Sequence, residues 1–194
     1  WTQDEFQAFL ECVADKPIFY YAFEMLYWTG IREGELLALT PADFNFEKKT
    51  LRINKSYQRL EGEDVITDPK TPKSNRTIVM PDFLAIEMED FIKSIYGIKM
   101  NDRIFTISKS YLHHEMDRGA KLAGVKRIRI HGLRHSHISL LINLGFSALA
   151  IGERVGHEAI DITYHYAHLF PTVQTDMAAQ LETEREALVN VKKE

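Results

Sequence analysis

Residues 50–57, Thr-Leu-Arg-Ile-Asn-Lys-Ser-Tyr, are where the spacing of apolar side chains changes from a helical to a strand pattern. Apolar and polar residues alternate here, which is typical of a strand with one buried face. Residues 61–63 read as a turn, a short second strand passes through residues 65–66, and a polar connection over 69–75 leads to a third strand over 76–80. Three short consecutive strands predict a small antiparallel sheet.

On both sides of this sheet, apolar residues recur at helical spacing. Gly30, Gly124, Gly145 and Gly156 follow such stretches and are typical helix ends. The fold class that we expect is therefore α+β, mainly α, with one small three-stranded antiparallel sheet. The predicted helices cover residues 3–14, 17–28, 33–39, 81–96, 108–123, 131–144, 147–155, 158–168 and 172–190.

The composition is that of an ordinary globular protein. The chain has 194 residues, 45% of them hydrophobic and 27% charged, which suffices for a large core without disulfides. The single cysteine, Cys12, excludes an internal disulfide and fits a cytoplasmic location. No apolar run reaches the ~18 residues of a membrane span, so no membrane partner is expected. Because the chain begins at Trp1 with a helical pattern already under way, we expect a fragment whose N-terminal part is missing.

The formal net charge of −4 has the wrong sign for a nucleic-acid-binding protein, but the charges are unevenly distributed. No Asp or Glu occurs from Arg118 to Gly152, whereas acidic residues collect near both ends of the chain. This basic middle is either a cationic face or an ordinary solvated surface. Its cationic residues are Arg118, Lys121, Lys126, Arg127, Arg129 and Arg134.

His131-Gly-Leu-Arg134 opens one of the predicted helices. Positions i and i+3 share a helix face, so His131 and Arg134 would project together. The free backbone N–H groups of a helix N-terminus also favour an anion. The sequence therefore indicates a phosphate site here, although His131 as a helix cap and Arg134 in a surface ion pair is an equally open interpretation of this motif alone.

Arg32 lies between two predicted helices, in a stretch rich in apolar residues. An arginine in such surroundings is costly unless it is paired, and Glu35 lies one turn away to orient it. His157 and Tyr166 are nine residues apart and would point in opposite directions on one straight helix, so they converge only if the chain turns between them. Taken alone, Tyr166 is better explained as a core aromatic residue, and Lys70 as a solvated lysine on an exposed hairpin.

Taken together, these residues resemble the signature of the tyrosine recombinase, or phage integrase, family. The matching words are TGIREGELLAL (29–39), PKTPKSNRTIVMP (69–81), HGLRHSHISLLINLG (131–145) and ERVGHEAIDITYHYAHL (153–169), spread over most of the chain. They are most similar to integrases of conjugative transposons and phages of Gram-positive bacteria. The resemblance implies that residues 1–194 are a catalytic domain without its N-terminal core-binding domain. The implied catalytic residues are Arg32, Lys70, His131, Arg134, His157 and Tyr166.

The resemblance also implies a mechanism for integrating or excising a mobile element. Tyr166 attacks a backbone phosphate of duplex DNA and forms a 3′-phosphotyrosyl intermediate, while Arg32 and Arg134 bind the phosphoryl oxygens. His157 donates a further hydrogen bond, and His131 accepts or relays the tyrosine proton. Lys70 protonates the leaving 5′-oxygen. We choose Lys70 rather than the nearby Lys73 because Lys-Thr before an Arg-x-Ile strand is the commoner form in the family.

The partners implied are double-stranded DNA and further copies of the chain. Residues Lys73, Arg76, Arg118, Lys121, Arg127 and Arg129 are the expected DNA contacts, with Glu35 supporting the arginines. The C-terminal stretch 172–191 would pack on a neighbouring protomer, giving a tetramer on DNA, or else on its own domain. No cofactor and no metal are expected, because a helical zinc protease motif needs Glu where this chain has Gly132.

Two alternatives remain open for the function. A type IB topoisomerase would use the same residues to nick and reseal one duplex. A degenerate integrase would bind DNA as a catalytically idle regulator. The complete set of catalytic residue types argues against the regulator, because a binding module has no use for an exposed tyrosine beside two arginines.

Overall fold

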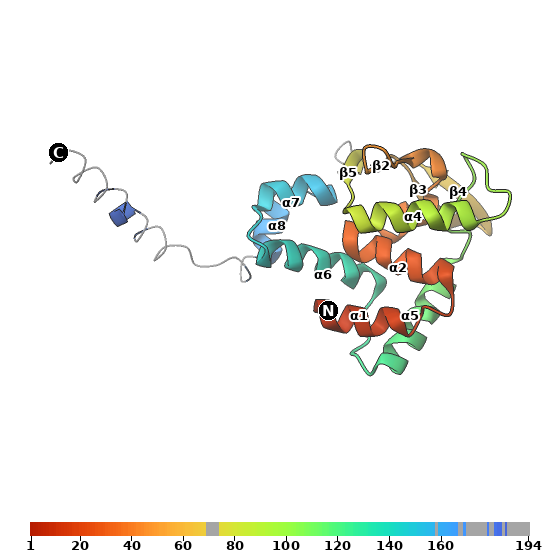
Figure 1. Cartoon of the computed structure of the whole chain (residues 1–194), viewed down its shortest axis with the longest axis horizontal. Helices are drawn as coiled ribbons and strands as arrows, with labels where there is room; N and C mark the ends of the chain where they lie inside the picture. The colour runs from red at the N-terminus through yellow and green to blue at the C-terminus, as the bar shows by residue number, and fades with distance from the viewer. Residues whose placement is uncertain are drawn as a thin grey trace.

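The computed structural model describes residues 1–68, 74–157, 159–166, 169, 178, 181–183 and 185. Helices dominate this part of the chain, and the strands gather on one side of it (Figure 1). The α+β, mainly α, fold class is confirmed. Most of the predicted helix 172–190 lies outside the described residues. The helices are α1 (Gln3–Glu11), α2 (Pro17–Thr29), α3 (Glu33–Ala38), α4 (Asp82–Ser94), α5 (Lys109–Ala123), α6 (Ile130–Asn143), α7 (Ala148–Val155) and α8 (Ala159–Tyr166).

The strands form a three-stranded antiparallel sheet and a separate hairpin. The sheet has the order β1 (Phe44–Asn45), β2 (Thr50–Ile53), β5 (Arg76–Val79), and the hairpin consists of β3 (Ser56–Leu60) and β4 (Glu63–Thr67). The sequence predicts the three-stranded sheet but not its members. The predicted strand 50–57 is two strands with different partners, which meet where Lys55 forms an ion pair with Asp43 at 2.5 Å. The sequence analysis also missed β1, because two residues are too few to show an alternation.

Local sequence signals explain the helix ends that frame the site. Thr2 and Glu5 form a reciprocal capping box at the start of α1. Gly30 ends α2 with a left-handed backbone, φ 66°, and Gly156 ends α7 in the same way with φ 70°. Residues with a Cβ rarely adopt this conformation, which explains the two glycines. Both lie directly beside functional residues, Gly30 two positions before Arg32 and Gly156 immediately before His157.

The buried apolar residues form two clusters of unequal size. The large cluster contains residues from the five helices α1, α2, α3, α4 and α5, from the sheet and from the first turn of α6. Phe9, Leu36 and Leu133 are among them. The small one contains Ile138, Ile142, Ile151, Val155 and Tyr166, from α6, α7 and α8. Figure 1 shows α7 and α8 at the end of α6 that is farther from α1. None of the helices in the described ranges is long and apolar enough to cross a membrane.

Candidate active site

Arg32 and Glu35 are joined at the start of α3. The guanidinium Nη1 of Arg32 donates to Oε1 of Glu35 at 2.8 Å, and the backbone N–H of Arg32 donates to Oε2 at 2.8 Å. Glu35 is buried, while 34% of the Arg32 side chain is exposed. The buried carboxylate therefore orients Arg32, whose side chain stays partly accessible.

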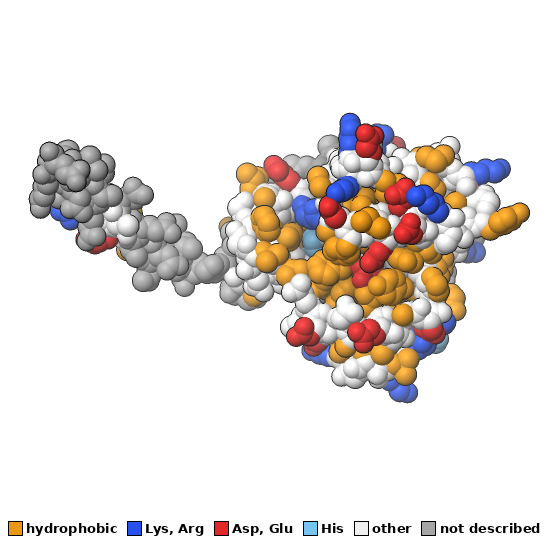
Figure 2. Space-filling view, viewed as in Figure 1, with side chains coloured by type: hydrophobic (Ala, Val, Ile, Leu, Met, Phe, Trp, Pro, Cys, Tyr) orange, Lys and Arg blue, Asp and Glu red, His pale blue; other side chains and the backbone are white. Residues whose placement is uncertain are grey.

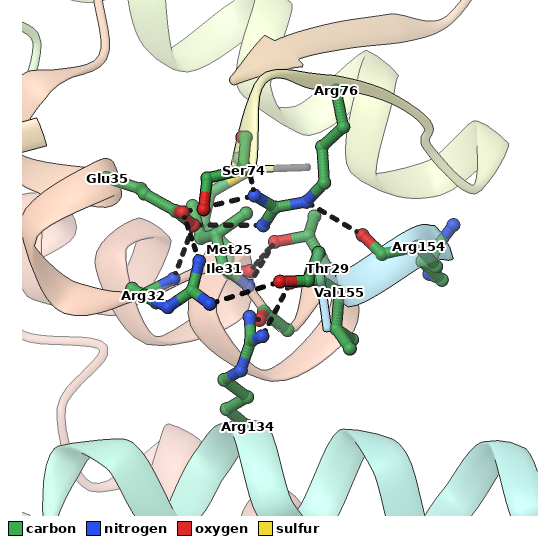
Figure 3. Close-up of polar contacts among 12 residues, drawn as sticks. Met25, Thr29, Ile31, Arg32, Glu35, Ser74, Arg76, Arg134, Arg154 and Val155 are labelled. Atoms are coloured by element: carbon green, nitrogen blue, oxygen red, sulfur yellow. Dashed lines mark hydrogen bonds and ion pairs between the residues drawn. The ribbon is translucent and has the colours of Figure 1, made fainter. Parts of the chain in front are cut away.

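Arg76 completes this ion pair from strand β5. Its guanidinium donates to both carboxylate oxygens of Glu35, at 3.0 and 2.9 Å, and Nε donates to the carbonyl of Arg154 at 2.9 Å (Figure 3). Only 6% of the Arg76 side chain is exposed. Arg76 was predicted to contact DNA, but its donors are directed inward. We expect Arg76 to hold Glu35 rather than to contact DNA.

The two arginines determine the charge of Glu35. Burial acts to raise the pKa of this carboxyl group, but hydrogen bonds and charge from Arg76, together with those from Arg32, outweigh it. The pKa of Glu35 therefore lies below its usual range. Glu35 is ionised at neutral pH, which keeps Arg32 and Arg76 in fixed positions.

Arg134 on α6 is the most deeply buried charged group of the site, with 1% of its surface exposed. It donates to the carbonyls of Gly30 and Val155 (Figure 3). Among the described residues no carboxylate forms an ion pair with Arg134, and its Nε has no hydrogen-bond partner. Burial and the nearby charge of Arg32 lower the pKa of Arg134 to about 9. A buried cation without an anionic partner favours binding of an anion.

The C-terminal end of α7 brings the arginines together. Three consecutive carbonyls accept from them: that of Arg154 from Arg76, that of Val155 from Arg134, and that of Gly156 from Arg32 at 3.2 Å. The last carbonyls of a helix lack partners within the helix and carry partial negative charge. The end of α7 therefore gathers cationic side chains from α6, β5 and the segment between α2 and α3 at one place.

His131 and His157 lie within electrostatic range of both site arginines. Burial lowers the pKa of His157 to about 4, with further contributions from Arg134 and Arg32. Burial, His135, Arg134 and Arg32 likewise lower the pKa of His131. Both imidazoles are neutral at pH 7 and are able to donate or accept one hydrogen bond through each nitrogen. The fold therefore brings four residues of the sequence motif into one site: Arg32, His131, Arg134 and His157.

Tyr166 at the end of α8 reaches the same site. The chain turns at Gly156, so that His157 lies before α8 rather than within one long helix with Tyr166. Tyr166 is 8% exposed, and its hydroxyl forms a hydrogen bond with Nδ1 of His135. Burial raises the pKa of Tyr166, against an opposing effect of Arg134, so that the hydroxyl is protonated at neutral pH. His135 was not among the predicted site residues, and its only signal was the four-residue spacing from His131.

The remaining basic residues do not form a uniform cationic face. Arg118 is paired with Glu115 and Asp15, and Arg127 is paired with Asp117 at 2.6 Å. Lys121 and Arg129 are exposed. On the face drawn in Figure 2, acidic and basic side chains are interspersed. Lys70 and Lys73 lie outside the described residues.

A groove of about 470 Å³ begins beside Arg32 and runs along the β3–β4 hairpin. Among the described residues, its lining includes Arg32, Glu35, Lys55 and Lys109 but not Arg134, His131, His157 or Tyr166. Of the candidate site residues, Arg32 and Glu35 therefore lie at this groove, whereas the buried Arg134 does not. No group of three or more His, Cys, Asp or Glu in the described ranges is arranged to hold a metal ion.

Comparison with known proteins shows the family to which this chain belongs. The model of the phage integrase family matches residues 1–172. This chain belongs to the phage integrase family. The chain is 29% identical to the ICEBs1 integrase of Bacillus subtilis (strain 168), over 94% of this chain and 54% of that protein. It is 31% identical to the integrase of Staphylococcus phage L54a, over 83% of this chain and 51% of that protein.

The chain thus spans about half the length of the curated relatives it matches. Solved structures of integrases share its fold. The Tn1549 transposon integrase in complex with circular intermediate DNA superposes with a TM-score of 0.72 at 23% identity, over 95% of this chain and 66% of that chain. The catalytic domain of the bacteriophage HP1 integrase superposes with a TM-score of 0.64 at 20% identity, over 93% and 92% of the two chains. The expected integrase-type fold is confirmed.

Proposed function

We propose that this chain is the catalytic domain of a tyrosine site-specific recombinase, which integrates or excises a mobile element by cleaving and rejoining duplex DNA. The observation that carries the proposal is the pair Arg32 and Arg134, which donate to adjacent carbonyls, while no carboxylate in the described part of the chain pairs with Arg134. A scissile phosphate fits this pair, because guanidinium groups bind phosphate oxygens through two parallel N–H donors. The family match favours this function over that of a type IB topoisomerase or an idle regulator.

In this proposal, Tyr166 attacks the phosphate and its oxygen becomes bonded to phosphorus. The bond to the 5′-oxygen breaks, and a 3′-phosphotyrosyl link stores the energy for rejoining. Arg32 and Arg134 bind the extra negative charge that develops on the phosphoryl oxygens, and His157 donates another hydrogen bond. Lys70 is the proposed donor of the proton to the 5′-oxygen. Glu35 and Arg76 hold Arg32 in position.

The proposed partners are double-stranded DNA and further copies of the chain. The exposed residues Lys121 and Arg129, together with Lys73, are the proposed phosphate contacts of the flanking duplex. Arg118 and Arg127 would have to exchange their carboxylate partners for DNA. A tetramer on DNA through the stretch 172–191, and a cytoplasmic location, complete the proposal.

Covalent trapping on DNA of randomised sequence tests this function whatever the target site is. A pool of such duplexes, with one nick beside each potential cleavage position, is incubated with the chain in EDTA, and SDS-resistant adducts are recovered and sequenced. Because of the nick, the released fragment that carries the free 5′-hydroxyl is short and diffuses away. The phosphotyrosyl adduct therefore accumulates. We expect adducts with a recurring sequence, linked through Tyr166.

Tyr166→Phe is the matched control, because it removes only the hydroxyl. It should form no adduct while retaining the DNA affinity of the unaltered chain. Adducts formed by the Phe variant, or attachment of the DNA to another residue, would refute Tyr166 as the nucleophile. An absence of adducts throughout the pool would refute the proposed strand cleavage.

A further inference from the structure

The hydroxyl of Tyr166 is held by a side chain that the sequence motif does not single out. It forms a hydrogen bond with Nδ1 of His135, and the centroids of the two rings are 5.9 Å apart. We propose that His135 is the catalytic base that takes the proton of Tyr166 during strand cleavage. This inference rests on the proposed function, in which Tyr166 is the nucleophile.

Geometry favours His135 over His131 for this role. A base has to lie within hydrogen-bond reach of the proton that it removes. The two histidines are one turn apart on α6, and their rings meet edge to face with centroids 4.8 Å apart. His135 lies between His131 and the tyrosine, and it is His135 that bonds to the reacting oxygen. His131 is then able to orient the ring of His135.

The surroundings keep His135 ready to accept a proton. Its pKa is lowered by partial burial and by the charges of Arg134, Arg129 and His165, so the ring is neutral at pH 7. His131 on α6 and Tyr166 on α8 also face it. Because burial raises the pKa of Tyr166, the nucleophile does not ionise unaided at this pH. In the tautomer that carries its proton on Nε2, Nδ1 of His135 accepts the tyrosine hydrogen bond.

The proton transfer balances with the bond changes at phosphorus. As the Tyr166 oxygen bonds to phosphorus, its proton moves to Nδ1 of His135, which becomes an imidazolium. The bond between phosphorus and the 5′-oxygen breaks, and that oxygen takes a proton from the general acid, for which Lys70 is proposed. His135 is exposed and carries the like charges of Arg134 and Arg129 nearby, so it releases the extra proton to solvent. Rejoining reverses every step.

Single-turnover cleavage of a nicked duplex recovered from the randomised pool tests this assignment. For His135→Ala we expect the first-order rate at pH 7 to fall at least about 100-fold, the usual contribution of a positioned base. The rate of the variant should rise about tenfold per pH unit, because the tyrosine then has to ionise by itself. The unaltered chain should reach a plateau above the pKa of His135. Added imidazole should restore part of the lost rate.

His135→Asn distinguishes proton transfer from mere positioning. Its side-chain oxygen lies near the place of Nδ1 and accepts the tyrosine hydrogen bond, but it does not take up the proton. We expect this variant to remain slow, whereas a positioning role predicts recovery to within about threefold of the unaltered chain. His114→Ala, which removes an exposed histidine from α5, is the matched control and should cleave at the unaltered rate.

A measurement without DNA separates failure of this inference from failure of the proposed function. Nitrogen NMR of the histidine rings should show His135 protonated on Nε2, with a shift of the Nδ1 signal in Tyr166→Phe. If that shift is absent, or if both His135 variants cleave at the unaltered rate, His135 is not the base. If the unaltered chain forms no covalent adduct at all, the strand cleavage itself is refuted, and the catalytic role of His135 with it.

Discussion

The two sides of the site are built differently. The arginine side belongs to the large apolar cluster: Arg32 follows α2, and Arg134 comes from α6 beside Leu133. The tyrosine side consists of α7 and α8 and belongs to the small cluster, in which Tyr166 packs with four aliphatic residues from α6 and α7. The arginine side is thus fixed by the body of the domain, whereas the tyrosine side depends on two short helices.

The boundary between the two sides is polar rather than apolar. The carbonyls of residues 154–156 accept from three arginines of the body, and Arg154 itself donates back to the carbonyls of Trp28 and Val79 and to Nε2 of His137. Because hydrogen bonds are directional, this boundary restricts the position of α7 more than apolar packing alone would. The difference teaches that the position of Tyr166 relative to Arg32 and Arg134 depends on a few charged hydrogen bonds.

Substitution of Arg134 by Lys should have the largest effect on this alignment. A lysine ammonium has no planar pair of donors, so it cannot bond the Gly30 and Val155 carbonyls together with a phosphate oxygen. We expect first-order cleavage to fall about 10²- to 10³-fold, or about 3–4 kcal/mol of transition-state stabilisation. The same change at Arg52, which is exposed on β2, is the matched control. Equal rates for Arg134→Lys and the unaltered chain would show that Arg134 is only structural.

Arg154→Met should detach the tyrosine side from the body. It removes the donors to the part-buried Trp28 carbonyl and His137 Nε2 and to the exposed Val79 carbonyl, which costs about 1–3 kcal/mol of unfolding free energy. Urea unfolding measures the loss, and hydrogen exchange should accelerate in α7 and α8 before α2 or α4. Arg52→Met should change the unfolding free energy by less than about 0.5 kcal/mol. Uniformly faster exchange throughout the domain would contradict a separable tyrosine side.

The sequence predicted the helices well, because their signals are local. Thr2, Gly30, Gly124 and Gly156 act within one turn of the helix ends that they mark. Strand pairing was harder, since the alternation over residues 50–57 continues while the partner changes from β5 to β4. Which strands pair is set by contacts distant in sequence, such as Lys55 with Asp43, and alternation alone does not report them.

Most residues of the candidate site were predicted from the family resemblance. Arg32, Glu35, His131, Arg134, His157 and Tyr166 are all brought together, although their catalytic roles remain predictions. His135 was not predicted, because its hydrogen bond with Tyr166 depends on where α8 returns to α6. The ion pair of Arg76 with Glu35 was not predicted for a related reason: whether an arginine faces solvent or a buried carboxylate depends on contacts distant in sequence.

His137 allows the polar boundary to be tested by pH. Burial, with the charge of Arg154, lowers its pKa from the ordinary 6.5 to about 3. Between these values the unfolded chain binds the proton and the folded chain does not, so stability falls as the pH is lowered. His137 alone should contribute about 1.4 kcal/mol per pH unit across most of this window. In His137→Gln, which keeps an acceptor for Arg154, the slope of unfolding free energy against pH should decrease by about one proton; an unchanged slope would show that His137 is protonated in the folded chain.

The smallest expected effect on stability comes from removing one methylene group from each apolar cluster. Ile151→Val in the small cluster and Ile53→Val in the large one both shorten a side chain that is 1% exposed. Each should cost about 1 kcal/mol. If the tyrosine side opens by itself, Ile151→Val accelerates hydrogen exchange in α7 and α8 alone, because the body stays folded in that opening. Ile53→Val should accelerate exchange of the slowest amides throughout the domain. Matching patterns for the two variants would show that both clusters unfold as one unit, and then the nucleophile is held as firmly as the arginines.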